Sequence, residues 1–212
     1  MNYRAFLFDF DGVIADTVGS NLKAWTEAFR EFGAAIEPED YLLLEGMPPL
    51  EIAASIARRR GVDESFAEKI FNLKEQKFSA LEACRIFPGV PELLSGLQRK
   101  GALLGLVSGA SRRRLQSILP QEIGQLFGSV VTAESVQHGK PAPDAFLFAA
   151  SELGVAPDDC LAIENAPLGI ASAKSAGMRC VAVCSTLGPD SLEKADYIVA
   201  DLEEARRLLL PK

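Results

Sequence analysis

The fold is decided by one stretch of the sequence, Phe6-Leu7-Phe8-Asp9-Phe10-Asp11-Gly12. The apolar run at positions 5–8 is typical of a strand that is buried on both faces of a parallel sheet. Two aspartates follow two positions apart, and Gly12 allows the chain to turn sharply away. In open α/β sheets the carboxyl ends of the strands are where ligands bind. We therefore expect Asp9 and Asp11 to share one pocket, with solvated turn aspartates as the alternative.

Length and composition limit the classes of protein to which the chain can belong. It has 212 residues, 48% of them hydrophobic, which is enough for one large domain or two unequal ones. With 29 Asp and Glu against 22 Lys and Arg, the net charge of −7 argues against a nucleic-acid or anionic-membrane surface. The arginine runs at 58–60 and 112–114 lie in helical patterns, and we expect them to be solvated faces.

The cysteine and histidine content narrows the chemistry. The four cysteines, at 84, 160, 180 and 184, lack metal-ligand spacing and are expected to be free thiols in a reducing compartment, the cytoplasm. No stretch has the length of a membrane span or the pattern of a secretion signal. The single histidine, His138, argues against a zinc site and a Ser-His-Asp triad. The groups that could still carry a reaction are carboxylates, hydroxyls, a lysine and a hard metal ion.

Two regions of the chain differ in the period of their apolar residues. Helical spacing predicts helices over 21–32, 41–44, 50–60 and 63–83, with no strand pattern between them. Later, apolar runs predict strands over 103–107, 129–132, 160–163, 179–183 and 197–200, which alternate with helices and indicate βαβ units. The expected fold class is α/β, with a Rossmann-like parallel sheet core of residues 1–15 and 84–212. An α-helical domain of residues 16–83 is inserted into it.

Polar residues follow four of the predicted strands. After Asp9 and Asp11, the turn at 108–111 offers the Ser108 hydroxyl and the amides of a helix start to an anion. Lys140 lies in a proline-rich loop that aims its ammonium group, and the pair at 164–165 offers oxygen ligands for Mg²⁺. Each feature alone has a plain explanation, such as a helix cap or a surface lysine. Parallel strands, however, bring all of them to one edge of the sheet.

Such a converging site suits a phosphoryl group held on Mg²⁺. Asp9, which is closest to the strand, is the expected nucleophile and would take the phosphoryl group as an aspartyl phosphate. Asp11 is the expected acid and base, which protonates the leaving oxygen and then activates water. Ser108, Gly109 and Lys140 would hold the phosphoryl group during transfer.

Taken together, the four motifs resemble those of the haloacid dehalogenase superfamily. The stretch 9–13 is similar to its first motif, Ser108 to its second, the stretch 140–144 to its third and the pair 164–165 to its fourth. The stretch 8–17 looks closest to the β-phosphoglucomutase-like branch and its sugar-phosphate phosphatase relatives. The resemblance implies that the helical insert is a cap that closes over the site about a hinge at Asp16 and Thr17. It also implies a Mg²⁺ site, with these residues as expected ligands: Asp9, Asp11 through its carbonyl, Glu164 and Asn165.

Two departures from the family pattern bear on the function. Asn165 stands where this branch usually has Asp, and its amide offers an oxygen with less charge, for which Glu164 is expected to compensate. The mutases of the branch hold a second phosphate with cations on a loop of the cap. Here the matching cap loop, residues 45–49, carries Glu45 and two prolines. We therefore expect a phosphatase of a small phosphorylated metabolite, a sugar or polyol phosphate. The cap residues expected to face the leaving group are Asn21, Glu45 and Met47.

Two alternatives remain open. One is a β-phosphoglucomutase-type phosphotransferase, whose second phosphate is held by residues that the sequence does not identify. The other is a catalytically silent binding protein of the same fold, with Asn165 as the lesion. For the enzymes, the expected cofactor is Mg²⁺ and the expected partner is a small phosphorylated metabolite, with no nucleic acid and no membrane. We expect a cytoplasmic monomer or weak homodimer.

Overall fold

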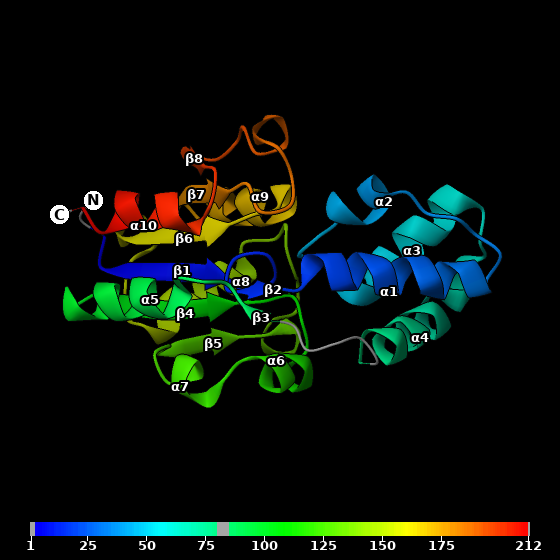
Figure 1. Cartoon of the computed structure of the whole chain (residues 1–212), viewed down its shortest axis with the longest axis horizontal. Helices are drawn as coiled ribbons and strands as arrows, with labels where there is room; N and C mark the ends of the chain where they lie inside the picture. Colours follow the sequence, from blue (N-terminus) through cyan, green and yellow to red (C-terminus); the bar gives the residue numbers. More distant parts are fainter. Residues whose placement is uncertain (1–2, 80–84, 212) are drawn as a thin grey trace.

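The computed structural model describes residues 3–79 and 85–211, which form a core built on a parallel sheet and a helical domain beyond it (Figure 1). We call this helical domain, residues 18–79, the cap. The carboxyl ends of the strands point toward the cap (Figure 1), so the loops that follow the strands lie between the two parts. The expected α/β class and Rossmann-like core are confirmed.

The core sheet has six parallel strands in the order β5-β4-β1-β6-β7-β8. They are β1 (Ala5–Asp9), β4 (Leu103–Val107), β5 (Ser129–Val131), β6 (Cys160–Glu164), β7 (Arg179–Val183) and β8 (Tyr197–Val199). The first strand in the sequence lies in the middle, and the order reverses between β1 and β6, which is the switch point where doubly wound sheets bind ligands. In register, Asp9 pairs with Val107, and Phe8 pairs with Ile163. The ends of β1, β4 and β6 are thereby brought together.

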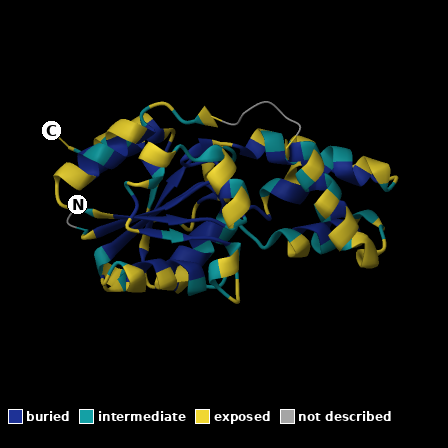
Figure 2. Ribbon diagram, turned by 90° about the horizontal axis from the view of Figure 1, so that it is seen from below, coloured by how far each residue is buried: buried dark blue, intermediate teal, exposed yellow. Residues whose placement is uncertain are grey.

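Helices cover both faces of the sheet, and the alternation along β1 shows why. Phe6 and Phe8 pack on one face with α5 (Val90–Arg99), α6 (Arg112–Ile118), α7 (Gln121–Gly124) and α10 (Leu202–Leu209). Ala5 and Leu7 pack on the other face with α8 (Asp144–Glu152) and α9 (Pro167–Ser175). Figure 2 shows buried strands between helices whose outer faces are exposed. Three short 3₁₀ turns complete the core: η2 (Ala133–Ser135), η3 (Pro157–Asp159) and η4 (Pro189–Ser191).

The cap has its own apolar core. Its helices are α1 (Val18–Glu31), α2 (Pro38–Leu42), α3 (Pro49–Arg60) and α4 (Ala67–Ser79), with the 3₁₀ turn η1 (Glu64–Phe66) before α4. Trp25 of α1 is central to this core and packs near the rings of Phe29 and Tyr41. Pro49 begins α3, and Gly61 ends it with φ +73, a conformation that glycine adopts without strain. The cap therefore has a hydrophobic centre separate from that of the sheet.

Two short strands connect the cap and the core, and the sequence analysis missed both. β2 (Ala15–Asp16) and β3 (Arg85–Ile86) pair antiparallel, so the expectation of no strand within 16–83 is wrong at its edge. Two-residue strands carry no periodicity that a sequence could reveal. The other differences are small: the helix expected from 21 begins at Val18, and the end of the helix expected over 63–83 lies outside the described residues.

Two further expectations concern the cysteines and the membrane. Three cysteines, Cys160, Cys180 and Cys184, are free thiols, while Cys84 lies outside the described residues. Among the helices in 3–79 and 85–211, none combines the length and the apolar character needed to cross a bilayer.

Candidate active site

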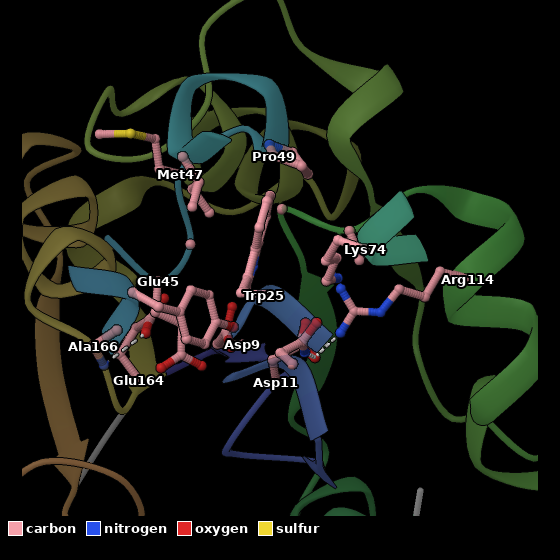
Figure 3. A pocket seen from close by; sticks show the side chains of 16 residues that line it. Asp9, Asp11, Trp25, Glu45, Met47, Pro49, Lys74, Arg114, Glu164 and Ala166 are labelled. Atoms are coloured by element: carbon pink, nitrogen blue, oxygen red, sulfur yellow. Dashed lines mark hydrogen bonds and ion pairs between the residues drawn. The ribbon is translucent and has the colours of Figure 1, made fainter. Parts of the chain in front are cut away.

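A pocket lies between the ends of the central strands and the cap (Figure 3). The core contributes Asp9, Asp11, Gly109, Ala110, Arg114, Glu164 and Ala166 to its lining. The cap contributes Asn21, Trp25, Tyr41, Glu45, Gly46, Met47, Pro49, Ile52 and Lys74. The expected nucleophile, acid/base and cap residues thus meet around one space, although they come from distant parts of the chain.

Three buried residues form an ion triad at the ends of the central strands: the carboxylates of Asp9 and Glu164 line this pocket, and Lys140 lines the neighbouring one. Lys140 Nζ lies 2.5 Å from Asp9 Oδ1 and 2.5 Å from Glu164 Oε1, and it also donates to the carbonyl of Val107 at 3.2 Å. The other oxygen of Glu164 accepts from the backbone amides of residues 165 and 166. Glu164 therefore orients Lys140, and both of its carboxylate oxygens already accept hydrogen bonds.

The charges of this triad do not cancel. Burial lowers the pKa of Lys140, but the carboxylates of Asp9 and Glu164 outweigh burial and raise it overall, so the lysine stays protonated. Burial, followed by the charge of Glu164, raises the pKa of Asp9 to about 8 in spite of the Lys140 ammonium group. One ammonium group does not balance two buried carboxylates. A cation bound beside Asp9 would lower its pKa again.

Asp11 is placed by a turn rather than by the strand. β1 ends at Asp9, and the turn closes through a hydrogen bond of 2.8 Å from the Gly12 amide to the carbonyl of Ala15. Asp11 Oδ1 accepts from the hydroxyl of Thr17 and from the guanidinium of Arg114, and Asn21 Nδ2 lies 3.4 Å away. The expected hinge residue Thr17 therefore holds the expected acid/base directly, whereas Asp16 lies in β2 and is exposed.

The turn after β4 is closed by a hydrogen bond of its own. Ser108 is buried, and its hydroxyl accepts from the amide of Ala110 at 3.0 Å, which closes the turn. Two amides at the start of α6 are occupied, because Ser111 accepts from the amide of residue 114 and Glu134 accepts from that of Arg112. Anion binding by the turn at 108–111 stays a prediction. Gly109 lines the pocket with Asp9, while Ser108 lines a neighbouring pocket with Lys140.

Asn165 is fully buried and links the core to the cap. Its Nδ2 atom lies 3.3 Å from Glu45 Oε1 of the cap loop and 3.1 Å from Thr186 Oγ1. Its Oδ1 atom has no hydrogen-bond partner within the described part of the chain. The first motif packs against this side chain, because a Cβ atom at Gly12 would lie 2.3 Å from Asn165 Nδ2.

The donor set fits Mg²⁺ better than a softer ion. Within 3–79 and 85–211, no three His, Cys, Asp or Glu side chains are grouped closely enough to hold a metal by themselves. The Asp9 carboxylate and the unpartnered amide oxygen of Asn165 are hard oxygen donors. Mg²⁺ suits such a site, because it keeps several waters and needs few protein ligands.

Two cations in the pocket were not identified from the sequence. Arg114 was expected on a solvated face, but its side chain is only 11% exposed, it pairs with Asp11, and its guanidinium lies 4.6 Å from the ring centre of Phe78. Lys74 is 2% exposed and pairs with Glu75 at 2.8 Å. The cap loop itself carries no cation, as expected, but α4 supplies one.

A signal for Lys74 existed in the sequence. Ile70, Lys74 and Phe78 are four residues apart and form the buried face of α4, so the lysine interrupts an apolar stripe. Arg114 had no such signal, because its two neighbours in the run are also arginines.

Among the expected cap residues, Glu45 has the most unusual environment. It is buried, and burial, followed by the charges of Asp9 and Asp11, raises its pKa well above the usual range. Asn21 and Met47 also line the pocket, as expected, and Figure 3 shows Met47 on the cap side above Asp9 and Asp11. Figure 3 also shows Arg114 reaching across to Asp11.

Comparison with known proteins agrees with this geometry. A family described as haloacid dehalogenase-like hydrolase matches residues 6–183. Validoxylamine A 7'-phosphate phosphatase of Streptomyces hygroscopicus subsp. limoneus is 34% identical over 96% of this chain and 96% of its own. Fructose-1-phosphate phosphatase YqaB of Escherichia coli is 31% identical over 85% of this chain and 96% of its own. A crystal structure of β-phosphoglucomutase from Clostridium difficile has a TM-score of 0.81 at 25% identity, and covers 99% of this chain and 100% of its own.

The chain belongs to the haloacid dehalogenase-like hydrolases. The expected family and enzyme class are confirmed, and the protein is a hydrolase of this superfamily with phosphatases among its relatives. One plant relative, SUPPRESSOR OF QUENCHING 1 of Arabidopsis thaliana, is 33% identical over 90% of this chain but only 19% of its own length.

Proposed function

We propose that the protein is a Mg²⁺-dependent phosphatase, which hydrolyses a small phosphorylated metabolite through an aspartyl phosphate on Asp9. The observation that carries the proposal is the buried triad at the switch point of the sheet, in which Lys140 holds Asp9 beside Glu164. A nucleophilic carboxylate, a cation for the phosphoryl oxygens and a second carboxylate two positions on are the parts that phosphoryl transfer needs.

In the first step, a carboxylate oxygen of Asp9 attacks phosphorus, and the bond from phosphorus to the ester oxygen breaks. Lys140 neutralises charge on the transferring oxygens, and Gly109 offers its backbone amide from the pocket wall. Asp11 gives its proton to the leaving oxygen. In the second step, Asp11 takes a proton from the water that attacks phosphorus. The bond to Asp9 then breaks, and inorganic phosphate leaves.

Three residues would hold Mg²⁺: Asp9 through its carboxylate, Asp11 through its backbone carbonyl and Asn165 through its unpartnered oxygen. When bound, the ion would neutralise charge on the phosphoryl oxygens and help to orient them for in-line attack. Glu164 stays a proposed ligand, although its hydrogen bonds favour the role of orienting Lys140.

We propose a sugar or polyol phosphate as the substrate. The cap side of the pocket combines polar groups, such as Asn21 and Glu45, with the flat ring of Trp25 and the side chain of Met47. This mixture suits a leaving group with hydroxyls along one side and carbons along the other. The fructose-1-phosphate phosphatase among the relatives supports the class. The free buried thiols support a reducing compartment, and we propose a cytoplasmic monomer or weak homodimer.

A second candidate is a phosphotransferase of the β-phosphoglucomutase type. Lys74 and Arg114 favour it, because Lys74 of the cap and Arg114 of the core place two cations in the pocket, although the cap loop carries none. The structural neighbour from Clostridium difficile supports it too. A mutase would require a sugar bisphosphate and would return the phosphoryl group to a sugar, whereas a phosphatase would release it to water.

The test is phosphate release from a panel of hexose phosphates, polyol phosphates, phosphoglycolate and a nucleotide, with Mg²⁺ or with chelator. We expect turnover that chelation abolishes and that Asp9→Asn lowers by at least about 10³-fold, because no nucleophile remains. Activity that survives Asp9→Asn would contradict the aspartyl-phosphate mechanism. Sugar isomerisation that depends on a bisphosphate would favour the mutase, and absence of both activities would favour the silent binding protein.

A further inference from the structure

Two buried oxygen atoms beside the proposed metal ligands have no hydrogen-bond partner among the described residues. They are Asn165 Oδ1 on the core and Glu45 Oε2 on the cap loop. Asn165 is 0% exposed and Glu45 is 3% exposed. A buried acceptor without a partner costs about 1–3 kcal/mol, so two of them on linked side chains point to a bound group that both can contact.

The orientation of the Asn165 amide follows from its neighbours. Its nitrogen lies within hydrogen-bond distance of Glu45 Oε1 and Thr186 Oγ1, at 3.3 and 3.1 Å. An NH₂ group has two hydrogens to donate, and this assignment uses both of them. The amide oxygen is therefore turned away from Glu45 and is available to a cation.

Glu45 is not paired with a Lys or Arg side chain in the described part of the chain. The charged groups that act on it most strongly are the carboxylates of Asp9, Asp11 and Glu164. A carboxylate buried among carboxylates is costly unless a cation joins them.

The loop that carries Glu45 lies very close to the core. A Cβ atom at Gly109 would lie 2.8 Å from the carbonyl oxygen of Gly46, and one at Gly139 would lie 2.6 Å from Pro48 Cγ. A side chain at either glycine would force the loop to move. The loop therefore lies against the core at two points, Gly46 and Pro48, and Glu45 directly precedes the first of them.

We propose that Glu45 supplies, from the cap, the negative charge that Asn165 lacks, so that the Mg²⁺ site is complete only when the cap loop lies on the core. The inference rests on the proposed function, because it needs Mg²⁺ beside Asp9. Mg²⁺ keeps several waters, so a carboxylate just beyond its direct ligands can act on it through one of them. Binding of the ion would then stabilise the closed position of the cap.

Calorimetry of Mg²⁺ binding without substrate tests the proposal independently of turnover. The proteins are wild type, Glu45→Gln, Asn165→Asp and the double variant, with Glu39→Gln as the matched control. Glu39 is an exposed carboxylate of the same domain, in α2. We expect Glu45→Gln to weaken Mg²⁺ binding about 10- to 100-fold, the usual cost of losing a partner outside the direct ligands. Asn165→Asp should tighten Mg²⁺ binding. In the double variant, Glu45→Gln should weaken Mg²⁺ binding by a smaller factor than it does alone.

The outcomes separate the inference from the proposed function. If Glu45→Gln and Glu39→Gln bind Mg²⁺ as tightly as wild type while Asp9→Asn does not, the role of Glu45 is overturned and the metal site stands. If wild type itself does not bind Mg²⁺, the metal-dependent function fails first. Hydrogen exchange gives a second readout: Mg²⁺ should protect the amides of residues 44–47 in wild type and not in Glu45→Gln.

Discussion

Two buried lysines lie near the active site, one in the core and one in the cap, and they differ in how their charge is balanced. Lys140, on the core side, is bonded to two carboxylates, which raise its pKa. Lys74, on the cap side, pairs with the half-buried Glu75 and lies 5.5 Å from the ring centre of Trp25 and 4.9 Å from that of Phe78. Burial, followed by the charge of Arg114, lowers the pKa of Lys74 to about 8. The core therefore holds a permanent charge, and the cap a charge that a modest rise in pH removes.

This difference suggests a division of tasks, in which the core residues suit the reaction and the cap residues suit the selection of the substrate. The core groups follow strand ends, where the hydrogen bonds of the sheet fix their positions, as the pairing of Asp9 with Val107 shows. The cap groups lie on helix faces and on a loop that can move with its domain. Rigid elements suit the residues that react with the phosphoryl group. In a separate domain, the residues that line the pocket can differ between relatives, so that each accepts a different leaving group.

The largest effect is expected from Lys140→Met. The substitution leaves Asp9 and Glu164 as neighbouring buried carboxylates and removes the cation that neutralises the phosphoryl oxygens. We expect kcat to fall by about 10³-fold or more, and the free energy of unfolding to fall by about 3–5 kcal/mol. Phosphate release and urea unfolding measure the two effects.

Lys174→Met is the matched control for that prediction. Lys174 pairs with Asp196 at 2.6 Å, but its side chain is 38% exposed and it lies outside the pocket. An exposed ion pair contributes about 0–1 kcal/mol, so we expect little loss of stability and no loss of activity. Similar losses in both variants would contradict the special role of the buried triad.

The next largest effect is expected from Arg114→Ala. Arg114 joins the two sides of the pocket, because it pairs with Asp11 of the core and its guanidinium lies over Phe78 of the cap. Without it, Asp11 loses a partner that fixes its position for proton transfer. We expect kcat/KM to fall about 10- to 100-fold, within the range of general acid–base catalysis. Steady-state phosphate release measures this.

Two further variants sharpen the test of Arg114. Arg113→Ala removes an exposed arginine of the same run and should leave kcat/KM unchanged. Arg114→Lys keeps the charge but loses the planar guanidinium, so it should restore only part of the activity. An Arg114→Ala protein as active as Arg113→Ala would show that the contact with Asp11 is incidental.

The core side was predictable from the sequence and the cap side only in part. Buried strands read as apolar runs, and polar residues after such runs meet at one edge because parallel strands share their direction. Asp9, Lys140 and Glu164 were found in this way. No local pattern could show that Glu164 bonds Lys140, because this depends on the distance between two loops after folding.

For the pocket residues that the sequence did not reveal, the missing information was which way each helix faces. Three consecutive arginines look alike in sequence, and only the packing of the seven-residue helix α6 turns Arg114 inward. The link from Asn165 to Glu45 joins residues 120 positions apart. The strands β2 and β3, which connect the cap and the core, were missed because two residues show no alternation. Long-range packing decided each of these.

A smaller effect is expected from Lys74→Met, and its sign depends on pH. At pH 7 Lys74 is charged in both folded and unfolded protein, so the full cost of burying the charge is present. Above about pH 8 the folded protein loses this proton while the unfolded chain keeps it up to about pH 10.5. The contribution of Lys74 to the free energy of unfolding of the wild type therefore rises between about pH 8 and pH 10.5.

We expect Lys74→Met to be more stable than wild type at pH 7 by about 1–2 kcal/mol, since each pKa unit is worth about 1.4 kcal/mol and the lost contacts offset part of the gain. The difference should shrink between pH 8 and pH 10.5. Urea unfolding at a series of pH values measures it. A constant difference across that range would show that Lys74 does not titrate there.

The smallest effect is expected from Gly139→Ala, which separates the two sides without removing a charge. Its Cβ atom would lie 2.6 Å from Pro48 Cγ of the cap loop, so the loop must move away from the core. Because cap residues line the pocket, we expect KM to rise roughly three- to tenfold while the triad stays intact. Gly188→Ala is the control, because a Cβ atom there would meet nothing within 4 Å. If both variants keep the wild-type KM, close seating of the cap loop does not contribute to substrate binding, and the division between core chemistry and cap selection must rest on side chains alone.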